Sequence, residues 1–96
     1  MNGVEISMKA ILTVIGQDKV GIIAGVSQKL QEFNINILDV NQTIMQEFFT
    51  MMMILDCKNM KENFDEVRAG LVAEGQRLGV EVKIQREEIF KSMHSL

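Results

Sequence analysis

The sequence predicts one small α+β domain in which the elements follow in the order strand, helix, strand, strand, helix, strand. Two apolar runs of strand length, at 8–15 and 48–55, indicate the interior of a sheet. Two other stretches, 22–33 and 64–78, repeat apolar residues at helical spacing. A chain of 96 residues that is 47% hydrophobic can bury one core of this size.

The first strand is predicted over residues 8–15. Ala10 and Leu12 fall on one face and Ile11 on the other, so both faces are largely apolar. Such a strand is expected at the centre of a sheet, covered on both sides. Residues 1–7 are expected to form a disordered leader before a single domain at 8–96, and the natural start, Met1 or Met8, is left open.

A polar turn at 16–21 joins this strand to the first predicted helix, at 22–33. The spacing places five apolar residues on one helix face: Ile22, Ile23, Val26, Leu30 and Phe33. Asn34 is expected to take a left-handed conformation after the helix. The turn leaves the backbone N–H groups of a helix N-terminus free, and a small anion can bind there.

Residues 36–45 alternate apolar and polar side chains, which predicts a strand at a sheet edge or against a polar surface. Residues 48–55 are apolar on both faces and predict a central strand. The two-residue connection between these strands makes them a hairpin.

Asn63 followed by Glu66 resembles a helix capping box, so the second helix is expected at 64–78, ending at Gly79. Residues 80–85 alternate cleanly and predict a fourth strand with one solvated face. Residues 87–94 are expected to form a short C-terminal helix.

Right-handed crossovers arrange these elements as a ferredoxin-like sandwich. Its four-stranded antiparallel sheet has the order 4-1-3-2, two helices cover one face, and a short C-terminal helix follows. The other face would expose apolar residues from the central strands. The chain is therefore expected to be a homo-oligomer, a dimer in the first instance, that covers this face or extends the sheet.

Composition argues against several classes of partner. A net charge of −3 without a basic cluster argues against nucleic acid and an anionic membrane surface. No apolar run approaches the ~18 residues of a membrane span, and no signal peptide is recognisable, so a cytoplasmic location is expected. Cys57 is the only cysteine, which excludes a disulfide within the chain.

Catalytic chemistry has little support. His94 lies near the chain end, Cys57 has no evident basic partner, and no His or Cys pair has metal-ligand spacing. Side chains in the run 51–53 alternate between faces, so these three methionines indicate packing and not a soft-metal site. No catalytic residue, metal or cofactor is predicted, and the chain is not expected to be an enzyme.

The turn at 16–21 lacks the Lys-Ser/Thr ending of a P-loop. On one interpretation it only connects a strand to a helix. On the other it forms a small-molecule pocket, where the backbone N–H groups of Gly21, Ile22 and Ile23 hold a carboxylate and Asp18 or Asn36 holds an amino group.

The segment 11–26, Ile-Leu-Thr-Val-Ile-Gly-Gln-Asp-Lys-Val-Gly-Ile-Ile-Ala-Gly-Val, resembles the opening of an ACT domain. The resemblance continues through Asn-Ile-Asn-Ile-Leu-Asp-Val at 34–40 and extends from Met8 to about Met93. Gln42-Thr43 and the segment 48–51 make the chain look like the small stand-alone bacterial ACT proteins. These are related to the glycine-cleavage transcriptional regulator and to the N-terminal domain of formyltetrahydrofolate deformylase.

The resemblance implies a ferredoxin-like regulatory domain that binds amino acids or other small ligands between ACT units. It implies the ligand-binding residues Gly16, Asp18, Lys19, Gly21, Ile22 and Ile23, with Asn36 and Ile37 opposite. Lys19-Val20 departs from the Arg-Pro pair of many ACT domains. The expected function is regulatory ligand binding by a homo-oligomer that changes its contacts with another protein; the alternative is an interaction module without a ligand. A small enzyme is a third hypothesis, and it would need an acid–base pair.

Overall fold

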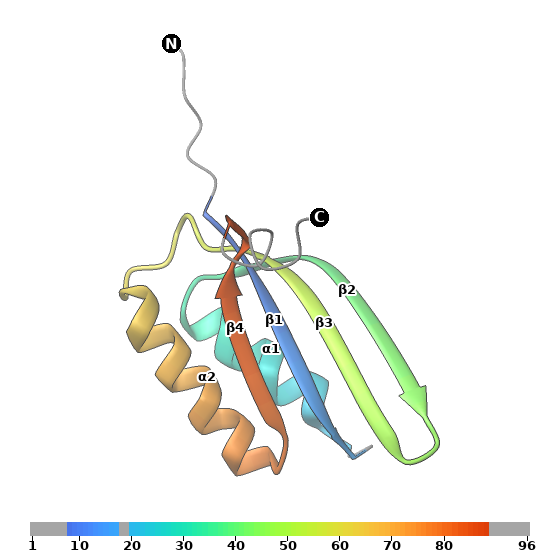
Figure 1. The fold of residues 1–96 in the computed structure, drawn as a ribbon. Coiled ribbons are helices and arrows are strands. Elements are labelled where there is room, and N and C mark those ends of the chain that lie inside the picture. The colour runs from blue at the N-terminus through green and yellow to red at the C-terminus, as the bar shows by residue number, and fades with distance from the viewer. Residues whose placement is uncertain (1–7, 18–19, 89–96) are drawn as a thin grey trace.

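The computed structural model describes residues 8–17 and 20–88 and forms two layers, a sheet with both helices on one of its faces (Figure 1). The elements are β1 (Lys9–Gln17), α1 (Ile22–Glu32), β2 (Asn36–Met45), β3 (Phe48–Asp56), α2 (Phe64–Leu78) and β4 (Glu81–Arg86). The strand order is β2-β3-β1-β4 and every pairing is antiparallel. The predicted ferredoxin-like fold and its strand order are confirmed.

The strand register defines two ends of the sheet. At one end Lys9 of β1 and Asn36 of β2 both pair with Asp56 of β3. At the other end Gln17 and Met45 both pair with Phe48, so β1 ends beside the β2–β3 hairpin (Figure 1). These are called the Asp56 end and the Phe48 end below. Every loop is thereby assigned to one end or the other.

The core lies between the sheet and the helices. Alternate residues of β1 and β3 point into it because successive side chains of a strand face opposite sides. The largest fully buried side chains come from these strands and from both helices: Leu12, Leu30, Met51, Met53, Leu55, Leu71, Val14, Val26 and Val67. All of β2 is exposed, which confirms the prediction of an edge strand, and β1 and β3 are central as expected.

The helix ends follow the predicted signals. The Glu66 backbone N–H donates to Asn63 Oδ1 at 2.8 Å, and Asn63 Nδ2 donates to Glu66 Oε1 at 3.0 Å. This side-chain pair begins α2, which ends at Gly79 in a left-handed conformation. Asn34, with a φ of 58°, follows α1 as predicted.

One expectation about the apolar surfaces was wrong. Ile23 was placed on the buried face of the first helix, yet its side chain is 40% exposed. The buried face runs through Ile22, Val26 and Leu30, and a neighbouring residue is turned about 100° away from it. The open face of the sheet exposes apolar side chains as expected for a single chain: Ile15, on the face away from the helices, is 43% exposed.

Two other predictions fall on parts of the chain that the structure leaves undescribed. Glu87 and Glu88 have helical backbone after β4, and the rest of the predicted helix at 87–94 lies outside the described residues. The predicted leader at 1–7 also lies outside them.

Candidate functional site

Gly16, predicted as the first residue of the turn, lies instead in β1, which continues to Gln17, and it is on the helix side of the sheet. A Cβ built at Gly16 would lie 2.6 Å from Val80 Cγ1 and 3.1 Å from Val80 Cβ. Real side chains do not approach so closely, so a larger residue would push β1 away from the start of β4. Packing against Val80 is therefore a sufficient reason for glycine at this position, independent of any ligand.

Gly21, the last residue of the turn, has a different role. Its φ is 94°, a left-handed backbone conformation that residues with a Cβ adopt at a cost. A Cβ built there would meet no atom of the described residues within 4 Å, and the residue is exposed. The conformation starts α1, and open space lies beside it.

The N-terminus of α1 begins at Gly21, a residue that has no side chain with which to cap the helix. The Gly25 N–H donates to the Gly21 carbonyl at 2.8 Å, which closes the first helical turn. Among residues 8–17 and 20–88 no side chain caps this end, and the first turn contains no acidic residue. By helix geometry the N–H groups of Ile22 and Ile23 have no carbonyl to bond within the helix, and the helix dipole adds partial positive charge. A carboxylate is complementary to this end.

The side chains predicted to bind a ligand at this turn differ in how far they are exposed. Ile22 is 2% exposed and packs in the core, so only its backbone can face a ligand. Ile23 is partly exposed and could contact one. Asp18 and Lys19 lie outside the described residues.

Asn36 and Ile37, the other half of the predicted site, lie at the Asp56 end of the sheet. The turn follows Gln17 at the Phe48 end. Nine residues of β1 separate the two ends, a distance of about 26 Å at ~3.3 Å per residue. One chain therefore does not bring the two halves of the predicted site together.

Asn36 and Ile37 instead line a groove of about 530 Å³ between α1 and the start of β2. Its other residues are polar for the most part: Ser27, Gln31, Asn34, Ile35, Asn59 and Lys61. Sequence reasoning missed this groove. Ser27 and Gln31, one helical turn apart on the polar side of α1, were the available signal.

The edge strand β2 exposes apolar side chains toward the helix side. Ile37, Val40 and Ile44 are 36%, 40% and 58% exposed. Their partners Leu55, Met53 and Phe49 on β3 are buried, since the helices cover β3 and not β2. The edge of the sheet beside α1 is thus an apolar strip with unpaired backbone groups.

The described residues offer little to catalysis. Burial, and secondarily the charge of Asp56, raises the pKa of the Cys57 thiol from 9.0 to about 11, which leaves it protonated at neutral pH. Within residues 8–17 and 20–88, no three His, Cys, Asp or Glu side chains are arranged to hold a metal ion. No helix in this part of the chain is long and apolar enough to cross a membrane.

Comparison of the sequence and the structure with known proteins identifies relatives of this chain. A UPF0237 protein of Listeria monocytogenes is 60% identical over 89 residues, which cover 93% of this chain and 100% of the relative. An ACT domain protein structure from Streptococcus pneumoniae matches with a TM-score of 0.78 at 45% identity, covering 90% of this chain and 97% of that one.

More distant structures share the fold alone. A formyltetrahydrofolate deformylase from Pseudomonas syringae has a TM-score of 0.73 at 21% identity, over 81% of this chain and 27% of the enzyme. A glycine cleavage system transcriptional repressor has a TM-score of 0.72 at 22% identity, over 85% of this chain and 47% of the repressor. Both proteins were named in the resemblance, which is confirmed. Because the ACT domain model itself matches residues 9–85, the chain belongs to the ACT domain family.

Proposed function

We propose that this protein is a non-enzymatic, cytoplasmic regulator that binds a small molecule, an amino acid in the first instance, as a homo-oligomer. One observation carries the proposal most directly: within the described residues, the N-terminus of α1 has no side-chain cap and no atom crowds a Cβ built at Gly21. A ligand carboxylate would accept hydrogen bonds from the backbone N–H groups of Ile22 and Ile23. Membership of the ACT family supports the same choice.

A second copy of the chain would complete the site. Two β2 strands can pair antiparallel about a twofold axis at Asn41, where paired side chains share a face. With the extra residue Leu38 skipped, as in the pairing with β3, Asn36 of one strand lies opposite Met45 of the other. Met45 is at the Phe48 end, where the β1–α1 turn lies. The partner's Asn36 would then approach the turn, from which Asn36 of the same chain is remote.

The same pairing would cover the apolar strip. It sets Ile37 of one copy opposite Ile44 of the other, twice across the axis, and both residues are exposed in the single chain. Edge backbone groups would gain partners at the same time. Burial of the apolar strip and the approach of the partner's Asn36 to the turn therefore favour the same dimer, in which two β2 strands pair.

Regulation would follow from this shared site. A ligand held by both copies stabilises the paired state relative to the separate chains. A regulated protein that contacts one of these states then responds to the ligand concentration.

The direct experiment measures thermal unfolding of the whole chain with each of the twenty amino acids, followed by calorimetric titration of those that raise Tm. A ligand at about a hundred times its Kd should raise the free energy of unfolding by about 2.7 kcal/mol. If none changes Tm or releases heat, amino-acid binding is excluded and the chain is better described as an interaction module without a ligand.

Variants test whether the site is shared. Gly21→Val and Asn36→Ala should each abolish binding while the oligomer persists, and Gln76→Ala, a change to an exposed residue of α2 away from β2 and the turn, should not. An equal mixture of the first two variants should recover about a quarter of the sites, because about half of randomly mixed dimers carry one intact site. Failure of the mixture to bind would show that each site lies within one chain.

A further inference from the structure

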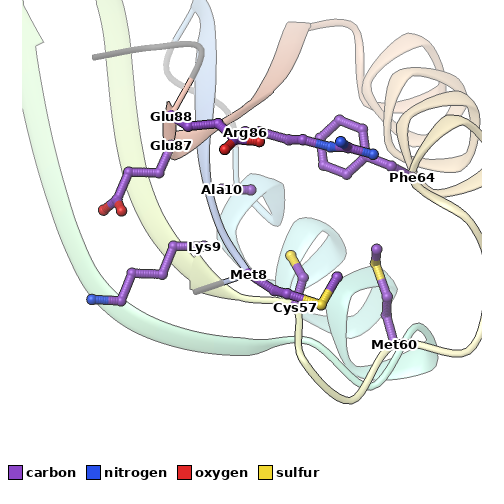
Figure 2. A pocket seen from close by; sticks show the side chains of 9 residues that line it. All are labelled: Met8, Lys9, Ala10, Cys57, Met60, Phe64, Arg86, Glu87 and Glu88. Carbon is purple, nitrogen blue, oxygen red and sulfur yellow. The ribbon is translucent and has the colours of Figure 1, made fainter. Parts of the chain in front are cut away.

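A separate cavity of about 290 Å³ opens at the Asp56 end of the sheet, between the start of β1, the loop after β3, α2 and the end of β4. Phe64 and Arg86 form one wall, where the Arg86 guanidinium lies 5.0 Å from the centre of the Phe64 ring. Three sulfur-containing residues, Met8, Cys57 and Met60, line another part (Figure 2). The ligand turn at the Phe48 end plays no part in this cavity.

The backbone itself holds the three sulfur residues together. The Cys57 N–H donates to the Met8 carbonyl at 2.8 Å, and the Met60 N–H donates to the Cys57 carbonyl at 3.1 Å. Figure 2 shows their side chains gathered on the same side of the cavity, with the sulfur atoms directed into it. Residues from β1 and from the loop after β3 thus present one thiol and two thioethers to a common space.

We propose that this cluster binds one Cu(I) ion through the Cys57 thiolate and the thioether sulfurs of Met8 and Met60. Thiolate and thioether ligands are soft and select a soft ion such as Cu(I). Binding exchanges the thiol proton for the metal, so Cu⁺ forms the Cu–S bond and one H⁺ passes to solvent. The thiolate and the monovalent ion together carry no net charge, which suits a buried cysteine.

The surroundings favour a monovalent soft ion over a divalent one. Glu87 and Glu88 also line the cavity, but Figure 2 places their carboxylates at a distance from the three sulfurs. Zinc and magnesium sites usually include imidazole or oxygen ligands or several thiolates, and this cluster has one thiol. Cys57 is 2% exposed and Met8 is 42% exposed, so an ion can enter past Met8 and be held against the buried thiol.

The test is an anaerobic titration of Cu(I) into the whole chain in competition with the chromogenic chelator bicinchoninate. One equivalent should bind, and X-ray absorption should show a shell of three sulfur atoms. Met8→Leu and Met60→Leu should each weaken binding about tenfold or more, and Cys57→Ser should abolish it. Met52→Leu, which changes a thioether on the open face of the sheet, should leave the affinity unchanged.

Circular dichroism of each variant checks that folding persists, and Met8→Leu remains informative if the change at buried Cys57 unfolds the chain. Unchanged affinity in Met8→Leu together with Met60→Leu, or a copper shell with a single sulfur, would overturn the proposal. The three sulfurs would then only pack against one another and the Phe64 wall.

Discussion

Gly16 on β1 and Val80 at the start of β4 are packed so closely that a methyl group at Gly16 would overlap Val80 Cγ1, at 2.6 Å. The two residues are far apart in sequence and meet because β4 pairs with β1 in the sheet. Gly16, which belongs to the proposed ligand site, is therefore also part of the packing between β1 and the segment that enters β4.

Replacing Gly16 with Ala should lower the free energy of unfolding by about 1–3 kcal/mol, because Val80 or the strand must shift. Combining it with Val80→Ala, which removes the overlapping methyl groups, should cost less than the sum of the two single changes. Urea denaturation of the four proteins of this cycle measures the coupling. Strictly additive costs would contradict the close approach.

Gly21→Ala should destabilise the protein for a different reason. Its backbone has a φ of 94°, which costs a residue with a Cβ about 1–2 kcal/mol, although the added methyl group meets no atom of residues 8–17 and 20–88 within 4 Å. Since no neighbour is involved, Val80→Ala should not reduce this cost. A cost of Gly21→Ala that disappears in the Val80→Ala background would show that crowding, and not backbone strain, is responsible.

Asn63→Ala removes the side chain that accepts from the Glu66 N–H at 2.8 Å. The start of α2 then loses its cap, and stability should fall by about 1 kcal/mol. Asn59→Ala, at an exposed position in the preceding loop, is the matched control and should change stability by less than about 0.5 kcal/mol. Thermal melts of the two variants give the comparison, and equal effects would argue against capping.

The pKa of Cys57 predicts that the stability of the protein depends on pH in the alkaline range. Burial first, and then the charge of Asp56, raise its pKa from 9.0 to about 11 in the folded chain. Between these values the unfolded chain has lost the proton and the folded chain keeps it, so stability falls as the pH rises from 9 to about 11. Urea unfolding across this range should show the loss in the wild type and a smaller loss in Cys57→Ala. Identical pH profiles would contradict the raised pKa.

Local patterns were sufficient for the elements and their order. Alternation in β2 marked an edge strand, and Asn63 with Glu66 marked the start of α2. The sequence pattern could not distinguish Ile22 from Ile23, because two adjacent apolar residues both fit one face of a helix. Only the packing of α1 in the fold shows that Ile22 is buried and Ile23 is partly exposed.

The two proposed sites could not be located from local sequence patterns alone, because their residues come together only through the register of the strands. Nothing local shows that Asn36 lies at the opposite end of the sheet from the turn, because this follows from the common pairing of Lys9 and Asn36 with Asp56. The same pairing brings Met8 beside Cys57, two residues that no short motif connects. Sequence reasoning weighed only the three adjacent methionines for a soft-metal site, because the sulfur residues of the proposed copper site come together only through this pairing.

The two exposed apolar surfaces of the sheet offer alternative ways to form a dimer, and one pair of variants separates them. Ile44 on the β2 edge is 58% exposed and Met52 on the open face is 40% exposed, so Lys at either position should leave the monomer folded. With paired β2 strands, Ile44→Lys disrupts two symmetric contacts with Ile37 and should weaken the dimer about tenfold, whereas Met52→Lys should not. Sedimentation equilibrium measures both dissociation constants. The reverse result would assign the interface to the open face, and the β1–α1 turn would then lack the partner's Asn36.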